Sequence, residues 1–140
     1  MDSNDSEVSE LLDTWLDASR AKDIDRLMSL YSADITYYDV VPPLRFAGRD
    51  EVRGNFLRWF DQYDGAIDLQ PHDMTIVMSE GVAFANLLVA DSGTRNNGVE
   101  GTAWVRATVC FQRSSDGWLI THEHISMPGG WAVTRSEEKS

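Results

Sequence analysis

The residues of this chain best suited to acid–base chemistry are one aspartate and two histidines that lie far apart in the sequence. Asp39 stands in the segment TYYDVVPP, between aromatic residues and a pair of prolines. A carboxylate that is desolvated in such surroundings has a raised pKa, which suits a general base. In a solvated turn, or as a helix cap, the same aspartate would have no catalytic role, and the residues alone leave both interpretations open.

His122 and His124 flank Glu123 in the segment GWLITHEHISM. Successive side chains of a strand point to opposite faces, so we expect the two histidines to share a face with Trp118 and Glu123 to lie on the other face. Glu123 therefore cannot join them in one site. Because histidine titrates near neutral pH, either ring could return a proton that Asp39 removes. A hydrogen-bonded structural pair is the alternative.

Metal binding is a further alternative for the two histidines. Residues spaced i, i+2 on a strand could hold one metal ion, but a catalytic metal needs at least a third ligand. His72 and Asp39 are the obvious candidates. The chain has no phosphate-binding loop, dinucleotide-binding glycine pattern or nucleophile elbow.

Two polar residues interrupt strands that are otherwise apolar. Arg106 in AWVRATV shares a face with Trp104, and if that face points inward the guanidinium needs a carboxylate partner such as Asp39. Such a pair would make Asp39 a weaker base and a better orienter of water; a structural salt bridge is the alternative. Asn86 in VAFANLLVA could donate to a substrate carbonyl or make a structural hydrogen bond.

The elements that must position these residues follow from the spacing of apolar side chains. Helices are expected over residues 7–22, 22–31 and 48–63, with caps at Ser6, Asp23 and Asp50. A strand over 33–41 is expected to end at the two prolines, and four more strands are expected at 66–79, 81–93, 99–114 and 117–127. Residues 1–6 are expected to form a mobile tail and 129–140 a C-terminal tail, on a single domain of residues 7–128.

This order collects the helices at one end of the chain and most strands at the other, which is typical of α+β proteins. One curved antiparallel sheet wrapped around the helices would bury both apolar faces and leave a hollow between them. The net charge of −11 disfavours nucleic-acid or anionic-membrane binding. No signal peptide or membrane-spanning run is present, so we expect a cytoplasmic protein, and the single Cys110 excludes an internal disulfide.

The same order of elements, with the segments DIDRLMSLYSADITYYD and DGWLITHEHISMP, resembles the ketosteroid isomerase / SnoaL-like family of the nuclear transport factor 2-like superfamily. The resemblance covers residues 7–128 and implies a cone-shaped fold. It implies Asp39 as general base, Tyr31 as a supporting tyrosine, Phe56 and Phe60 as pocket residues, and no metal or cofactor. It also implies that the face of His122 and His124 lines the pocket.

The sequence departs from that family at the two groups that hold the oxyanion. Trp15 and Trp104 stand, by position, where ketosteroid isomerases have a tyrosine and a protonated aspartate. An indole N–H can donate a hydrogen bond but supplies no acidic proton. We therefore expect a substrate other than the steroid of a true isomerase.

We expect a cofactor-free enzyme that isomerises, cyclises or dehydrates a small hydrophobic, polyketide- or steroid-like molecule. An apolar pocket favours such a flat ligand; its expected walls are Trp15, Tyr37, Phe56, Phe60 and Trp104. Two alternatives stay open: a cyclase that works by orienting its substrate without a base, and a non-catalytic ligand-binding module. The resemblance also implies a homodimer formed through the outer sheet face, with residues such as Val105, Ala107 and Val109.

Overall fold

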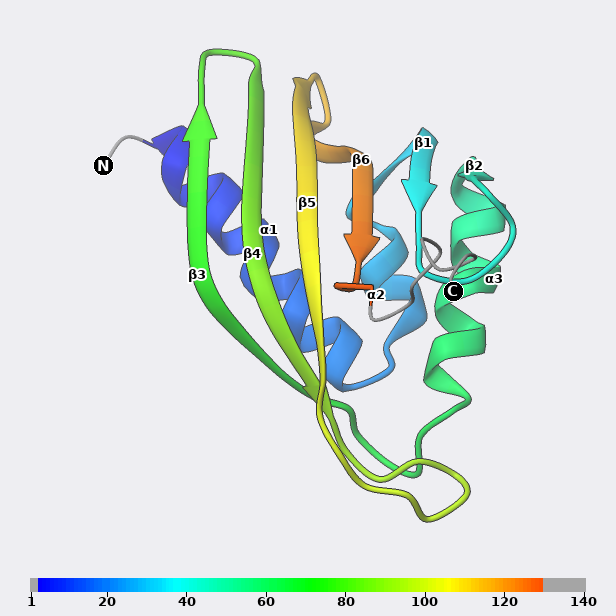
Figure 1. Ribbon diagram of the computed structural model, residues 1–140. Helices are drawn as coiled ribbons and strands as arrows, with labels where there is room; N and C mark the ends of the chain where they lie inside the picture. The colour runs from blue at the N-terminus through cyan, green and yellow to red at the C-terminus, as the bar shows by residue number, and fades with distance from the viewer. Residues whose placement is uncertain (1–2, 130–140) are drawn as a thin grey trace, which may run out of the picture.

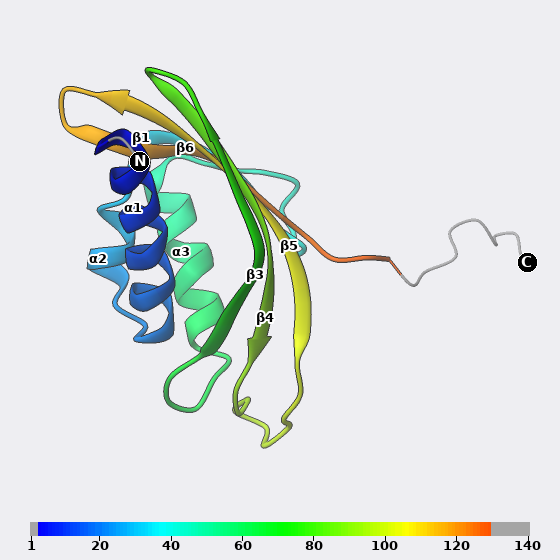
Figure 2. The ribbon, with the colours of Figure 1, turned by 90° about the vertical axis from the view of Figure 1, so that its left-hand side faces the viewer.

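A curved six-stranded sheet with three helices on one of its faces makes up the computed structural model, which describes residues 3–129. Figure 2 shows that the sheet bends around the helices and that its opposite face is uncovered. The predicted α+β class, with a curved sheet wrapped around three N-terminal helices, is confirmed. No helix between residues 3 and 129 is both long enough and apolar enough to cross a membrane.

The elements occur in the predicted order, with one short strand that was not predicted (Figure 1). They are α1 (Ser3–Arg20), α2 (Ile24–Met28), β1 (Tyr31–Tyr38), β2 (Phe46–Ala47), α3 (Arg49–Phe60), β3 (Asp68–Met78), β4 (Val82–Ser92), β5 (Ala103–Ser114) and β6 (Gly117–Ser126).

The beginnings of the helices differ in part from the predictions. α1 already starts at Ser3, so the predicted start after a cap at Ser6 was wrong, and residues 3–6 of the predicted N-terminal tail are helical. The other residues of that tail, 1–2, and residues 130–140 of the predicted C-terminal tail lie outside the described residues. Asp23 does cap α2, because its carboxylate accepts a hydrogen bond from the backbone N–H of Arg26 at 3.3 Å. α3 instead follows Gly48, whose φ of 88° favours glycine, and the predicted cap Asp50 lies inside its first turn.

The order of strands in the sheet is β2-β1-β6-β5-β4-β3. Strands β3 to β6 form an antiparallel meander, whereas β1 runs parallel to β6 and pairs Tyr38 with His124. Because β1 and β6 are neighbours that run in the same direction, their C-terminal ends lie side by side. Asp39, which follows β1, therefore lies beside the end of β6.

The concave face of the sheet packs against α1 and α3 to form the core. On β5, the inward residues are Val105, Ala107 and Val109, of which the last two are at most 1% exposed. The prediction that these three residues form the outer face was therefore wrong. Apolar residues occupy both faces of β5, with Trp104 at 48% exposure on the outside, so alternation alone cannot tell which face is buried.

A β-bulge in β6 changes which of its residues point inward. Ile120 pairs with Phe111 and His122 pairs with Cys110, so Thr121 is one extra residue on this strand. Before the bulge the even-numbered residues, such as Ile120, are buried; after it Glu123 is buried and His124 is exposed. The prediction of unbroken alternation from Trp118 to Ser126 was wrong for this reason.

The bulge generates a first prediction. Deleting Thr121 removes the extra residue but leaves Ile120, His122 and Glu123 on their present faces. We expect this variant to unfold cooperatively, with a free energy of unfolding lowered by roughly 1–3 kcal/mol. Deleting Thr108, where β5 pairs regularly, moves half a strand to the wrong face and should abolish the folded state. Chemical denaturation followed by circular dichroism measures both; equal behaviour of the two deletions would contradict the assignment of the bulge.

Candidate active site

A partly open cavity of about 310 Å³ lies between α3 and the concave face of the sheet. Residues at helical spacing on α3 form one wall of the cavity: Asn55, Phe56, Arg58 and Trp59. Gln62, just after the end of the helix, continues this wall. The remaining walls come from α1, β1 and the strands: Trp15, Tyr37, Asp39, Val40, Val41, Leu69, Val89, Asp91, Arg95, Ala103, Val105, Ile125 and Met127. The lining is mostly apolar with a few convergent polar groups, as in sites for small molecules.

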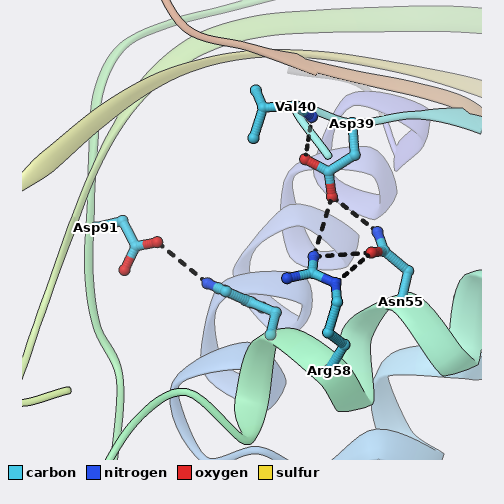
Figure 3. Close-up of polar contacts among 6 residues, drawn as sticks. Asp39, Val40, Asn55, Arg58 and Asp91 are labelled. Atoms are coloured by element: carbon cyan, nitrogen blue, oxygen red, sulfur yellow. Dashed lines mark hydrogen bonds and ion pairs between the residues drawn. The ribbon is translucent and has the colours of Figure 1, made fainter. Parts of the chain in front are cut away.

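Asp39 is held at one side of this cavity by hydrogen bonds to both of its oxygens (Figure 3). Its Oδ1 accepts from the backbone N–H of Val40 at 2.7 Å, and its Oδ2 accepts from the side-chain amide of Asn55 at 2.8 Å. Arg58 makes an ion pair with Oδ2 at 3.9 Å and is itself held by the Asn55 carbonyl oxygen at 2.8 and 3.1 Å. The carboxylate of Asp39 is 13% exposed. It is thus fixed in orientation and largely withdrawn from water.

Asp39 also stands where the cavity meets solvent. An open groove on the outer side of the sheet is bordered by Tyr38, Arg45 and His124 and shares Asp39 with the cavity. A proton taken up by this carboxylate can therefore pass to bulk water without crossing the core.

A second carboxylate, Asp91 of β4, lines another wall of the same cavity (Figure 3). The Tyr63 hydroxyl donates to its Oδ1 at 2.6 Å, and Trp59 Nε1 donates to its Oδ2 at 3.2 Å. Asp91 is 8% exposed, and this burial raises the pKa of its carboxyl, an effect that the hydrogen bonds from Tyr63 and Trp59 partly offset. Arg95 packs over the Tyr63 ring, 4.4 Å from its centroid.

A third carboxylate, Glu123 of β6, is fully buried beside the cavity wall. The Tyr31 hydroxyl donates to its Oε1 at 2.6 Å and accepts from Trp15 Nε1 at 3.0 Å, so the chain ties α1, β1 and β6 together. Its Oε2 has no hydrogen-bond partner among the described residues. Burial raises the pKa of Glu123 to about 8, although the hydroxyls of Tyr31 and Tyr37 pull it down. Glu123 is therefore mostly a neutral acid at pH 7.

Four predicted site residues line the cavity: Asp39, Trp15, Tyr37 and Phe56. Two others lie behind its wall, because Tyr31 is fully buried and Phe60 packs against Phe56 at 6.2 Å between ring centroids. The indole N–H of Trp15 is already used by Tyr31, so it is not available as a donor to a ligand.

The other five predicted site residues lie on the outer face of the sheet, and their expected inward orientation was wrong. The His122 ring bonds through Nδ1 to the carbonyl of Thr36 at 2.8 Å. The Tyr38 ring lies 5.0 Å from the His122 ring and 5.3 Å from that of His124. Asn86, Trp104 and Arg106 are exposed on neighbouring strands.

Arg106 does not contact Asp39. Its Nε donates to the Ser126 hydroxyl at 3.0 Å on the outer face, and Arg58 of α3 is the arginine that pairs with Asp39. His72, the expected further ligand of a metal held by His122 and His124, packs against Trp104 with 4.9 Å between the ring centroids. Nowhere in residues 3–129 do three His, Cys, Asp or Glu side chains converge to hold a metal ion.

Sequence reasoning missed the polar residues that the cavity gathers from α3 and β4. Asn55 and Arg58 are spaced i, i+3 and follow the apolar stripe of the predicted helix, which places them near the same face. Asp91 ends the apolar run AFANLLVAD and lies two residues after Val89, which points inward. Because every second residue of a strand points to the same face, Asp91 could have been assigned to the inward face. Glu123 carried no such signal, because the bulge is not visible in the sequence.

Comparison with known proteins supports the fold. The model of the SnoaL-like domain family matches residues 8–130. A search of curated proteins finds no match. An NTF2-like protein of unknown function from Pseudomonas putida KT2440 is similar in structure, with a TM-score of 0.82 and 24% identity over 91% of this chain and 88% of that one.

Two further solved structures show the same fold at lower identity. One is a ketosteroid isomerase-like protein from Erwinia carotovora atroseptica SCRI1043, with a TM-score of 0.78 and 18% identity over 92% of this chain and 99% of that one. The other is the association domain of C. elegans CaMKII, with a TM-score of 0.69 and 17% identity over 89% of this chain and 96% of that one.

The buried Glu123 generates a prediction on pH and stability. Its pKa of about 8 in the folded protein lies above the ordinary 4.5, so the folded state holds a proton that the unfolded state loses as the pH rises. We expect the free energy of unfolding to fall by a few kcal/mol between about pH 5 and about pH 9, since a tenfold change in proton affinity corresponds to about 1.4 kcal/mol.

The neutral isostere Glu123→Gln should flatten this dependence, because it keeps the acceptor for Tyr31 and has no proton to lose. Denaturant titrations of both proteins across the pH range measure it. Glu80→Gln, at an exposed position of the β3–β4 turn, serves as the matched control and should follow the wild type. An unchanged slope in Glu123→Gln would show that another group carries the effect.

Proposed function

Because the chain belongs to the SnoaL-like domain family, we propose that it is a cofactor-free enzyme that removes a proton from carbon in a small apolar carbonyl compound. Asp39 is the general base. The observation that carries this proposal is the position of its carboxylate, oriented by Val40 and Asn55 at the edge of an apolar cavity. A carboxylate held ready in this way contributes about 10²–10⁴-fold to such a step.

The shape of the ligand follows from the walls of the cavity. Trp15, Tyr37, Phe56 and Trp59 present aromatic surfaces to it, which favours a flat or polycyclic molecule of polyketide or steroid type. The guanidinium of Arg58 and the amide of Gln62 also line the cavity and can donate hydrogen bonds to an enolate oxygen formed in it. Isomerisation, cyclisation and dehydration all begin with this enolate.

The apolar walls also support the second candidate, a cyclase that orients its substrate without using a base. In that case Asp39 and Arg58 would form a structural ion pair. The two candidates differ in what the removal of the carboxylate does to proton transfer.

Exchange of α-hydrogens for deuterium tests the proposal without knowledge of the natural product. We expect the protein to accelerate exchange in flat apolar ketones such as β-tetralone in heavy water, followed by NMR. Asp39→Asn should lower the catalysed rate by about 100-fold or more, because the amide cannot accept the proton.

Asp34→Asn, an exposed change on β1, the strand that Asp39 follows, is the control and should leave the rate unchanged. Saturable binding of the ketone without catalysed exchange, or exchange that survives in Asp39→Asn, would favour the orienting cyclase or a ligand-binding module over a base.

We also propose that the protein forms a homodimer through the outer face of the sheet. The face carries large exposed apolar side chains, with Phe84 at 41%, Leu88 at 36% and Trp104 at 48% exposure. Although the chain has 23 acidic residues, no Asp or Glu is exposed on β4, β5 or β6, as both carboxylates of these strands are buried. Two copies with a net charge of −11 each can approach here without facing carboxylates.

A carboxylate placed on this face should separate the copies. We expect the wild type to be a dimer at micromolar concentration by light scattering, and Phe84→Glu to be a folded monomer. Val99→Glu introduces the same charge at a 57% exposed position between β4 and β5 and should remain dimeric. A monomeric wild type, or a dimer unaffected by Phe84→Glu, would refute the outer face as the interface.

A further inference from the structure

The outward orientation of His122 and His124 leaves the cavity without its expected proton donor. Of the groups that line the cavity in the described part of the chain, two are carboxylic acids, Asp39 and Asp91. The arginines stay charged at every working pH, and burial raises the pKa of Tyr37 well above its ordinary 10.0. Asp91, whose pKa is raised by burial, is therefore the remaining acid of the lining besides Asp39.

The contacts of Asp91 direct its proton toward the cavity. Trp59 Nε1 donates to Oδ2 at 3.2 Å, and an indole nitrogen cannot accept a hydrogen bond in return. A proton carried on Oδ2 therefore has no acceptor in the indole and is free to meet a ligand. The Tyr63 hydroxyl on Oδ1 at 2.6 Å fixes the plane of the carboxyl group.

The two carboxyl groups also differ in the charge of their partners. Asp39 forms an ion pair with the positively charged Arg58. Asp91 is 8% exposed and accepts hydrogen bonds from the neutral donors Tyr63 and Trp59, and at such a buried position the neutral acid costs less to bury than the ion. The charge of Arg95, which packs over the Tyr63 ring, lowers the pKa of Asp91 and offsets part of this preference. Pairs of acids whose surroundings differ in this sense divide the roles of base and acid between them.

We propose that Asp91 is the general acid of the cavity and that the substrates are apolar β-hydroxy ketones, which the protein dehydrates. This inference rests on the proposed function, because it assumes that Asp39 removes the α-hydrogen. A general acid at Asp91 favours dehydration over the other reactions that start from the enolate. An isomerase can return the proton through the base that took it, whereas the loss of water needs a second acid at the leaving hydroxyl.

The step balances as follows. Asp39 takes the α-hydrogen, and the electrons of the C–H bond form the new C=C bond. The bond from the β-carbon to its hydroxyl oxygen breaks, and this oxygen leaves as water with the proton of Asp91. Asp39 ends protonated and Asp91 ionised, and exchange with water at the rim beside Asp39 and within the emptied cavity restores both.

The aldol adduct of acetone and benzaldehyde tests the inference, because it is an apolar β-hydroxy ketone whose dehydration product is a conjugated enone visible by absorbance. We expect Asp91→Asn to lower the dehydration rate by about 100-fold or more. Exchange of its α-hydrogens for deuterium, which needs Asp39 alone, should persist in this variant. Asp39→Asn should lose both.

The acetate ester of the same adduct separates an acid from a structural residue, because acetate leaves without a proton. Asp91→Asn should eliminate acetate at nearly the wild-type rate. Equal losses with the alcohol and the ester would overturn the role of Asp91, and so would catalysed exchange by the wild type with no dehydration of the alcohol. If the wild type catalyses neither dehydration nor exchange, the proposed function itself is refuted.

The pH profile provides a second readout should Asp91→Asn fold poorly. Dehydration by the wild type should decline at high pH as Asp91 loses its proton. The Trp59 hydrogen bond lowers the pKa of Asp91, so Trp59→Phe should move this decline to higher pH. An unshifted decline would contradict the inference. Asp116→Asn, exposed in the β5–β6 turn, is the matched control and should retain the wild-type profile.

Discussion

One extra residue in β6 determines the chemistry of both faces of the sheet. Because Thr121 forms a bulge, the strand buries Ile120 before it and Glu123 after it, and it turns His122 and His124 to the outside. The buried glutamate then joins α1 and β1 through Tyr31 and Trp15. Without the change of phase, two imidazoles would occupy the core and an acid would lie on the uncovered face.

The distribution of acids and bases over the fold follows from this arrangement. Asp39, Asp91 and Glu123 are all withdrawn from solvent on the concave side, and each has a different set of partners. Arg58 pairs with Asp39, Tyr63 and Trp59 donate to Asp91, and tyrosine hydroxyls act on Glu123. All three histidines lie on the outer, convex face of the sheet. The concave side thus holds the groups for proton transfer, while the convex side is free of carboxylates on its central strands.

Much of the fold follows from the sequence, because helical spacing and turn signals are local properties. The order of elements, the cap at Asp23 and the four long strands were predicted in this way. The orientation of β5 was not predictable, since Trp104 and Val105 are both apolar and packing against the helices decides between them. The same limit applies to Arg106, because alternation put it on the face of Trp104 but could not say whether that face points inward. Asp39 and the aromatic residues Trp15, Tyr37 and Phe56 were placed at the cavity by resemblance to the family, whereas Asp91 needed the inward parity of β4.

Helix α3, with the residues that follow it, holds both carboxylates of the cavity in place. Its residues Asn55 and Arg58 hold one carboxylate of the cavity, and Trp59 with the following Tyr63 holds the other. Substitutions within this nine-residue stretch can therefore retune both proton affinities while the sheet and its core stay intact. Descendants of such a scaffold can acquire new reactions through one surface helix, which offers a physical route by which a single architecture diversifies.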